Sequence, residues 1–210
     1  SSVDEEGARL NVEAEIPNWD FEGVMKQANT AWNEALGKID IETSDNDSRT
    51  VFYTSLYHAF IQPSLASDVD GRYRTMGHEI KQDASYTNYT VFSLWDTFRA
   101  AHPLYTIVTP EQNQAFIRSL LRKYDEGGIL PKWELASNET GTMIGYHAVS
   151  VIADAMMKKQ CDFDVKKALE ACIRSSVYDT TGVTPMMDRQ ILNGKLMPVS
   201  IKYKNELGYI

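Results

Sequence analysis

An apolar period of about 3.6 residues recurs along most of this chain and limits it to a mainly helical fold. The spacing predicts six amphipathic helices, over residues 18–39, 48–62, 93–107, 110–127, 140–158 and 164–177. Helices joined in antiparallel hairpins, with long connections at alternate positions, are the pattern of an α/α toroid. We therefore expect part of an (α/α)6 toroid. Residues 179–210 carry turn signals and no clear helical pattern.

Polar, Pro and Gly residues predict where several of these helices begin and end. Asn18 or Asp20 is expected to cap the first helix, and Asp47 or Ser48 the second, which stops before Pro63. Residues 109–112, TPEQ, form a capping box, and residues 127–128, GG, predict a left-handed helix end. Gly145 is expected inside the fifth helix, at a close packing contact.

The N-terminal segment has a different pattern. Apolar and polar residues alternate from Leu10 to Ile16, which is typical of a β-strand, and Pro17 ends the run. A single strand has no partner here, so we expect it to complete a sheet outside this chain or to cap the helices.

Charge and hydropathy exclude two classes of partner. The formal net charge is −8 and the 21 Lys and Arg residues are scattered, which argues against a nucleic-acid partner. No apolar run approaches the ~18–20 residues of a membrane span. The first ten residues show neither an initiating Met nor a signal sequence and are typical of the middle of a longer protein.

Four further patterns have simple interpretations. Cys161 and Cys172 are too few and too far apart for a zinc site and are expected as free thiols. The sequons at Asn46, Asn88 and Asn138 are interpreted as chance matches. Asp68-Val-Asp70-Gly71 starts like a calcium loop but lacks the remaining ligands, so a solvated turn is favoured. The histidines show no metal-binding spacing, and those at positions 58 and 147 are expected to be packing residues.

Two loop-to-helix segments, 86–102 and 130–147, each place a tryptophan beside a carboxylate. Aromatic rings beside hydrogen-bonding acids suit a sugar, so we predict that the two segments form one polar-aromatic pocket. Its candidate residues are Trp95, Asp96, Arg99, Trp133, Glu134 and Glu139. The alternative for Asp96 and Glu139 is that each only complements a helix N-terminus, and for the tryptophans that they belong to the core.

Arg99 follows Asp96 by three residues and is expected to hold its carboxylate in place. An ionised, anchored Asp96 suits the acceptance of hydroxyl hydrogen bonds better than proton donation. Trp133 and Glu134 are expected in a loop, where a large aromatic has less structural reason to occur than in a helix.

Three segments carry a resemblance to a known family: 52–74 (FYTSLYHAFIQPSLASDVDGRYR), 89–112 (YTVFSLWDTFRAAHPLYTIVTPEQ) and 127–155 (GGILPKWELASNETGTMIGYHAVSVIADA). They resemble the calcium-dependent exo-α-mannosidases of glycoside hydrolase family 92. The resemblance implies that residues 1–17 end an N-terminal β-sandwich domain. It also implies that residues 18–210 are the first half of an (α/α)6 catalytic domain.

The resemblance further implies an inverting exo-α-mannosidase of the α-1,2 type, with Ca²⁺ at the mannose 2- and 3-hydroxyls and mannose-containing glycans as substrates. It assigns Trp95 and Asp96 to the 4- and 6-hydroxyls of a terminal mannose, and Trp133 to the same subsite.

Two motifs of the family are missing from this chain. The E-G-N segment, with the general acid, and the G-N-D-D-C-G-Q segment, with the general base, do not occur in its 210 residues. The catalytic acid and base, and most of the calcium ligands, are therefore expected beyond Ile210. The chain is thus expected to be an inactive fragment that depends on the remainder of its own polypeptide.

The resemblance also implies a periplasmic, cell-surface or secreted bacterial protein. Two alternatives stay open from the sequence: a non-catalytic helical carbohydrate-binding or interaction module, and another (α/α)6 glycosidase.

Overall fold

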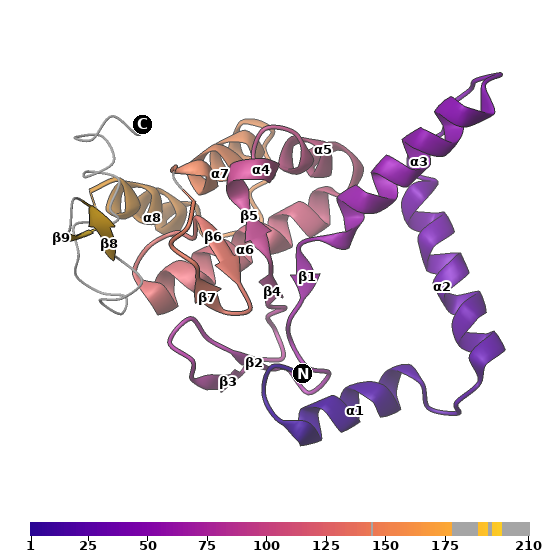
Figure 1. The fold of residues 1–210 in the computed structure, drawn as a ribbon, viewed down its shortest axis with the longest axis horizontal. Helices are drawn as coiled ribbons and strands as arrows, with labels where there is room; N and C mark the ends of the chain where they lie inside the picture. Colours follow the sequence, from indigo (N-terminus) through magenta and orange to yellow (C-terminus); the bar gives the residue numbers. More distant parts are fainter. Residues whose placement is uncertain (144, 178–188, 193–194, 199–210) are drawn as a thin grey trace.

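The computed structural model describes residues 1–143, 145–177, 189–192 and 195–198 (Figure 1). Its helices are α1 Glu5–Glu15, α2 Phe21–Leu36, α3 Asn46–Ile61, α4 Leu94–Thr97, α5 Ala101–Val108, α6 Pro110–Gly127, α7 His147–Met157 and α8 Val165–Val177. Its strands are β1 Ser64–Leu65, β2 Arg72–Arg74, β3 Ile80–Gln82, β4 Tyr89–Thr90, β5 Phe92–Ser93, β6 Trp133–Leu135, β7 Asn138–Glu139, β8 Arg189–Leu192 and β9 Lys195–Pro198. The prediction of a mainly helical chain is confirmed.

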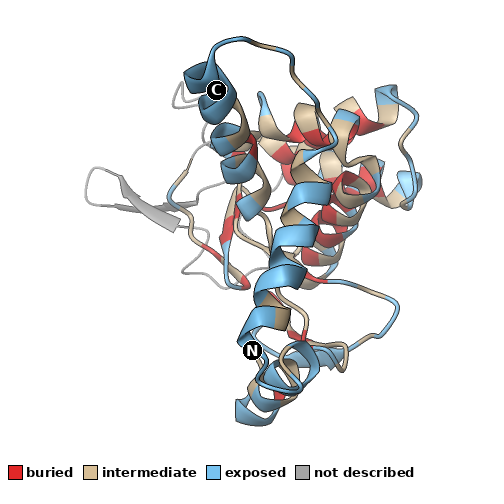
Figure 2. Cartoon of the chain, turned by 90° about the vertical axis from the view of Figure 1, so that its right-hand side faces the viewer, coloured by how far each residue is buried: buried red, intermediate tan, exposed pale blue. Residues whose placement is uncertain are grey.

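The hydrophobic core lies among α5, α6, α7 and α8, with α6 in contact with the other three. The apolar stripe of α6 is fully buried at Phe116, Ile117 and Leu120. Small residues of α8, Ala168 and Ala171, allow that helix to approach closely. Figure 2 shows the buried residues concentrated in this part of the molecule.

Helix α6 has the predicted bounds, but only one of its predicted caps. Pro110 occupies the first turn, and Gly128 ends the helix at φ 83°, with its N–H donated to the Tyr124 carbonyl. The Thr109 side chain makes no capping hydrogen bond, because its backbone at φ −143° and ψ 59° lies outside the usual cap geometry. The predicted capping box is therefore wrong.

The third predicted helix is interrupted, and the fifth begins later than the periodicity predicts. Residues 93–107 divide into α4 and α5, and the fifth helix, α7, starts at His147 rather than near residue 140. Gly145 lies before α7 at φ +107°, a conformation that favours glycine, so its prediction as a helical packing residue is wrong. The second helix is capped by Asp45, whose carboxylate accepts from the Asp47 and Ser48 amides, instead of by either of those residues.

The N-terminal strand prediction is also wrong. Residues 5–15 form helix α1, with Asp4 as N-cap accepting from the Gly7 amide at 2.7 Å. Arg9 pairs with Glu6 and Glu13 at helical spacings of three and four residues. These local interactions favour the helix over a seven-residue alternation that has no sheet partner. Residues 1–17 therefore do not supply the expected last strand of a β-sandwich.

Helices α1, α2 and α3 extend away from the core (Figure 1). No residue of α2 is buried, and α3 buries only Leu56, whereas Val51, which the apolar period places on the inward face, is 64% exposed. The rings of Trp32 and Tyr57 meet at 4.5 Å between α2 and α3. Along the described residues, no helix is both long enough and apolar enough to cross a membrane.

Candidate functional site

A three-stranded antiparallel sheet, β5–β6–β7, joins the two segments that carry the candidate residues. Ser93 of β5 pairs with Trp133 of β6, and Phe92 pairs with Glu134. The two segments therefore lie side by side through this strand pair, and their joining into one polar-aromatic pocket stays a prediction. The same pairing places Trp133 and Glu134 on a strand rather than in the predicted loop.

Trp95 and Asp96 lie just beyond this sheet, on the short helix α4. The Trp95 side chain is 38% exposed, so it does not belong to the core. Asp96 is also exposed, and its Oδ2 accepts a hydrogen bond from Ser93 Oγ at 2.5 Å. Because Ser93 is the strand partner of Trp133, this bond ties the Asp96 carboxylate to the tryptophan segment of β6.

Arg99 does not hold Asp96 as predicted: among the described residues, the Arg99 guanidinium and the Asp96 carboxylate form no ion pair. Its guanidinium instead lies 5.5 Å from the Trp95 ring centroid and 5.2 Å from that of Phe98. It also donates a hydrogen bond to the Trp95 carbonyl at 3.2 Å. Arg99 thus supports the tryptophan through a cation–π contact, and Ser93 orients the acid.

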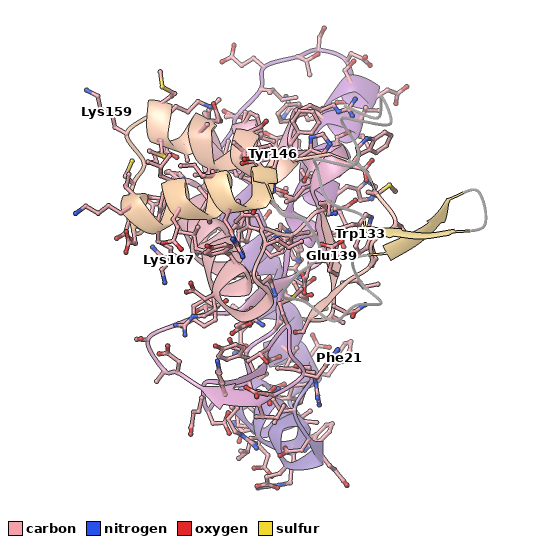
Figure 3. The ribbon with its side chains drawn as sticks, turned by 90° about the vertical axis from the view of Figure 1, so that its left-hand side faces the viewer. Phe21, Trp133, Glu139, Tyr146, Lys159 and Lys167 are labelled. Carbon is pink, nitrogen blue, oxygen red and sulfur yellow. The ribbon has the colours of Figure 1, made fainter. Side chains whose placement is uncertain are left out.

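Glu139 organises the backbone of the tryptophan strand. It is only 5% exposed, and its carboxylate accepts from the amides of Lys132 at 2.8 Å, Trp133 at 3.3 Å and Gly141 at 3.1 Å. Figure 3 shows the labelled Trp133 and Glu139 close to each other. The carboxylate thus supports the backbone around Trp133, and its predicted role in substrate binding stays a prediction. It lies on β7, away from the N-terminus of α7.

Glu134 is fully buried, and its oxygens accept from Lys123, Thr90, Val91 and Ser137. A carboxylate with this many protein donors and no exposure does not reach a ligand on the surface. Its predicted contact with substrate is therefore wrong in this structure. Trp95, Asp96 and the half-buried Trp133 are left as the accessible groups, and together they offer aromatic surface beside a hydrogen-bond acceptor.

The catalytic acid and base are predicted beyond Ile210, which itself lies outside the described residues. Their location therefore stays a prediction. Within the described part of the candidate site, Glu134 and Glu139 are both bound by protein donors. Neither of these two acids is placed to protonate a leaving group or to activate a water molecule.

The described residues contain no group of three or more His, Cys, Asp or Glu side chains placed to bind a metal ion. Asp68 and Asp70 form the predicted turn, which Gly71 closes by donating its N–H to the Asp68 carbonyl at 2.9 Å. Asp68 is 5% exposed, however, so the turn is not solvated at that residue. Both cysteines are free, as predicted.

Two of the histidines pack against other side chains, whereas His58, predicted as a packing residue, is exposed on α3. His102 is 1% exposed and lies 3.3 Å from Asn113 Oδ1 through its Nδ1, and burial lowers its pKa to about 4. The ring of His147 stacks on that of Phe98 at 4.2 Å, which agrees with its prediction as a packing residue. Among the sequons, Asn88 is 2% exposed, in accord with a chance match.

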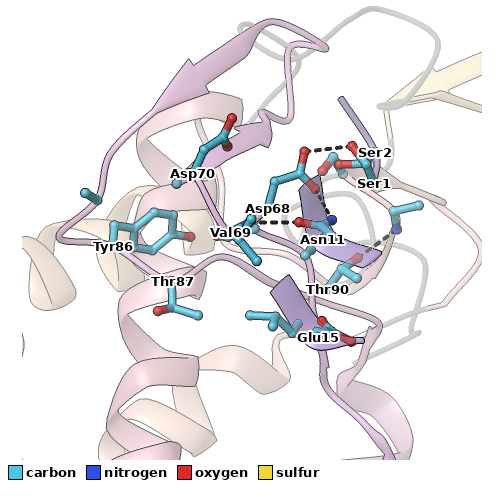
Figure 4. Close-up of a pocket in the computed structure, with 17 residues that line it drawn as sticks. Ser1, Ser2, Asn11, Glu15, Asp68, Val69, Asp70, Tyr86, Thr87 and Thr90 are labelled. Atoms are coloured by element: carbon cyan, nitrogen blue, oxygen red, sulfur yellow. Dashed lines mark hydrogen bonds between the residues drawn. The ribbon is translucent and has the colours of Figure 1, made fainter. Parts of the chain in front are cut away.

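A cleft of about 730 Å³, which sequence reasoning did not predict, lies between α1 and the turn at residues 66–71 (Figure 4). Asp68 accepts there from Ser1 Oγ at 2.7 Å and from Asn11 Nδ2 at 2.9 Å, and Asn11 Oδ1 accepts from the Val69 amide. The Asp-Val-Asp-Gly pattern was the one sequence signal for this region. In the structure these residues dock α1 through the hydrogen bonds of Asp68 and Val69.

Comparison with known proteins decides the family. The model of the glycosyl hydrolase family 92 catalytic domain matches residues 7–210. The chain belongs to this family. The family 92 alpha-mannosidase BT3965 from Bacteroides thetaiotaomicron is 40% identical, with a TM-score of 0.81 over 85% of this chain and 24% of that one. The inverting mannosidase BT2199 from the same organism is 27% identical, with a TM-score of 0.81 over 98% of this chain and 27% of that one.

An uncharacterized secreted glycosidase from Arthroderma benhamiae is 30% identical over 182 residues, which cover 84% of this chain and 19% of that protein. This family 92 chain therefore spans about a quarter or less of the length of these relatives. Its mainly helical fold agrees with the solved members.

Proposed function

We propose that the protein containing this chain is an inverting, calcium-dependent exo-α-mannosidase of the α-1,2 type that acts on mannose-containing glycans. Family 92 membership and the likeness to two mannosidase structures support this reaction class. BT3965 has also been solved in complex with mannoimidazole. The observation that carries the proposal is the joining of Trp95 and Asp96 to Trp133 through the β5–β6 pair.

Within this enzyme, the chain supplies residues that bind the terminal mannose. Trp95 and Trp133 present aromatic surface for the sugar ring, and Asp96 accepts hydrogen bonds from hydroxyls, which we assign to the 4- and 6-positions. A hydrogen bond to a charged acceptor is about twice as strong as a neutral one and directional, so Asp96 fixes the orientation of the ring. Arg99 keeps Trp95 in place through its ring and carbonyl contacts.

The bond-breaking groups are assigned to the remainder of the polypeptide. An inverting glycosidase needs one carboxylic acid for the leaving oxygen and one carboxylate for the attacking water. Glu134 and Glu139 are both committed to protein donors. We therefore propose that the acid, the base and most of the calcium ligands lie in segments beyond Ile210, together with the helices that complete the (α/α)6 toroid. We also propose that the protein is exported, because a 30% identical relative is described as a secreted glycosidase.

Replacement of Asp96 by alanine in the full-length protein tests this function. The variant loses a charged hydrogen bond that strengthens in the transition state, which should cost about 2–4 kcal/mol of transition-state stabilisation. The kcat/KM on α-1,2-mannobiose should therefore fall roughly 30- to 1,000-fold. Asp47→Ala is the matched control, because Asp47 is an exposed acid in the first turn of α3 and lies outside the site. The control should retain full activity.

Unchanged kcat/KM in Asp96→Ala would refute the assignment of Asp96 to the sugar site. If the full-length protein binds mannosides but does not hydrolyse them, with or without added Ca²⁺, it is a binding module rather than an enzyme. Clear hydrolysis by the 210-residue chain alone would contradict the placement of the acid and base elsewhere.

A further inference from the structure

A buried ion pair lies under the sheet that carries the candidate sugar site. Lys123 Nζ of α6 is 3.1 Å from Glu134 Oε1 of β6, and the two side chains are 1% and 0% exposed. Lys123 also donates to Asn88 Oδ1 at 3.3 Å. Taking two charges out of water is costly, and an apolar pair of the same volume often stabilises a fold equally well. The pair therefore calls for an explanation other than stability.

The Glu134 carboxylate joins two turns that flank its strand. On one side it accepts from Thr90 Oγ1 at 2.9 Å and from the Val91 amide at 3.1 Å, where β4 passes into β5. On the other it accepts from the Ser137 amide at 2.7 Å, between β6 and β7. Thr90 Oγ1 in turn accepts from the Ala136 amide at 2.8 Å, so the two turns are linked through one hydroxyl and one carboxylate.

These turns hold unusual backbone conformations. Val91 has φ +67°, Ala136 +49° and Ser137 +64°, all in the left-handed region that residues other than glycine rarely adopt. A β-branched residue such as Val91 is particularly strained there. Such conformations persist only where the surroundings fix them, and the amides of all three residues are bound by Glu134 or by Thr90.

The constrained turns determine the position of the sugar site. Val91 immediately precedes Phe92 and Ser93, which pair with Glu134 and Trp133. Ser93 Oγ then donates to Asp96. A shift of the turn at Val91 would move Ser93, and with it both the Asp96 carboxylate and the strand partner of Trp133.

We infer that Glu134, held in its buried position by Lys123, is a positioning residue that fixes the geometry of Asp96 and Trp133 for the sugar. The inference rests on the proposed function of the Asp96 site. A carboxylate suits this role because its two oxygens offer about four acceptor positions for donors from three separate segments. A neutral side chain of the same shape, such as glutamine, has one acceptor oxygen and would direct N–H bonds at the amide of Val91 or Ser137.

The test uses two variants of the full-length protein, Glu134→Gln and the double variant Lys123→Met/Glu134→Gln. The first leaves a buried lysine without its counter-ion, so it should lower both the stability and kcat/KM. The second removes the unpaired charge and should recover stability, but it still lacks the second acceptor oxygen. We expect kcat/KM on α-1,2-mannobiose to remain about 10- to 100-fold below wild type in the folded double variant. If kcat/KM returned with stability, the pair would be merely structural and the inference overturned.

Asn113→Ala provides the matched control, because Asn113 is also fully buried and polar but contacts His102, away from the sheet. It should lower stability and leave the kcat/KM of the folded enzyme unchanged. Combination with Asp96→Ala gives the second measurement. If Glu134 acts through Asp96, Glu134→Gln should cost much less kcat/KM in the Asp96→Ala background than in wild type.

The outcomes separate the two proposals. An effect of Asp96→Ala without one of Glu134→Gln on the folded enzyme overturns the positioning role and leaves the sugar site intact. Independent, multiplying effects overturn the route through Asp96. No effect of Asp96→Ala overturns the proposed function and the positioning inference together.

Discussion

Docking of helix α1 depends on a glycine, and its replacement gives a sharp prediction. Gly7 is the one buried residue of α1, and it faces the Asp68 carboxylate. A Cβ at this position would lie 2.3 Å from Asp68 Oδ2. That oxygen is held by Ser1 Oγ at 2.7 Å, and the other oxygen of the carboxylate is held by Asn11 Nδ2 at 2.9 Å. Asp68 cannot move without loss of these bonds.

The magnitude follows from two opposing contributions. Gly7→Ala stabilises the helix by about 0.5–1 kcal/mol, because alanine has less conformational entropy than glycine in the unfolded chain. Displacement of Asp68 loses at least one hydrogen bond to a charged group, which costs about 1.5–3 kcal/mol. We expect the free energy of local opening of α1 to fall by about 1–2 kcal/mol, so its amides should exchange roughly 5- to 30-fold faster.

Hydrogen exchange of the full-length protein, resolved to peptides over residues 8–16, measures this opening. Gly23→Ala in α2 is the matched control, since both glycines follow an Asp N-cap by three residues. Its Cβ would meet only Asp20, the cap of its own helix, at 2.4 Å. Gly23→Ala can change the exchange of the α2 amides, but the amides of α1 should exchange as fast as in wild type. Equal or slower exchange of α1 in Gly7→Ala would refute the docking contact.

Two further predictions concern the core. Phe116→Ala should lower the free energy of unfolding by about 3–5 kcal/mol, because the ring is 4% exposed and packs against Tyr89 and Tyr105 at 4.9 and 5.6 Å. Urea denaturation measures this loss, and Ile107→Ala at a 74% exposed position should change it by less than about 0.5 kcal/mol; equal effects would contradict the core assignment. The pKa of His102 is lowered from the ordinary 6.5 to about 4. As the pH falls, the His102 side chain is therefore protonated in the unfolded chain before it is protonated in the folded chain. Its contribution to stability is therefore complete above pH 6.5 and is lost as the pH falls towards 4, by about 3 kcal/mol. His102→Gln should flatten this part of the stability–pH curve, and a curve as steep as that of wild type would contradict the assignment.

Helices were predictable where an apolar helical period runs over several turns, and this holds even for α2, which buries no residue, and for α3, which buries only Leu56. The sixth predicted helix, 164–177, agrees closely with α8, and α6 ends at the predicted glycine. The failures occur where periodicity is short or a local interaction intervenes. Residues 10–16 alternate as a strand would, yet Asp4 and the pairs made by Arg9 stabilise a helix there. The positive φ of Gly145, which delays the start of α7, leaves no mark in an apolar pattern.

The adjacency of the two candidate segments was predictable, but the surroundings of each candidate residue were not. A tryptophan beside a carboxylate marks both segments, and strand pairing brings them together. The same signal cannot separate an acid that faces a ligand from one that faces the protein. Asp96 and Glu134 each follow a tryptophan directly, but Asp96 is exposed and Glu134 is fully buried. The difference depends on Lys123, Thr90 and Val91, which lie 11 to 44 residues from Glu134 in the chain.

The acids of the candidate site fall into two groups: Glu134 and Glu139 are buried, and Asp96 is exposed. Glu139 accepts from the amides of Lys132, just before β6, and of Gly141, which follows β7. Glu134 accepts from the amides of Val91 and Ser137 in the two turns that flank β6. Both buried acids thus accept hydrogen bonds from the protein. The exposed Asp96 accepts from Ser93 and keeps its remaining acceptor positions for a ligand. A sugar hydroxyl gains most from an acceptor that is already oriented, because less ordering is needed on binding. The buried acids therefore contribute to the proposed recognition of mannose by keeping Asp96 and the two tryptophans in place.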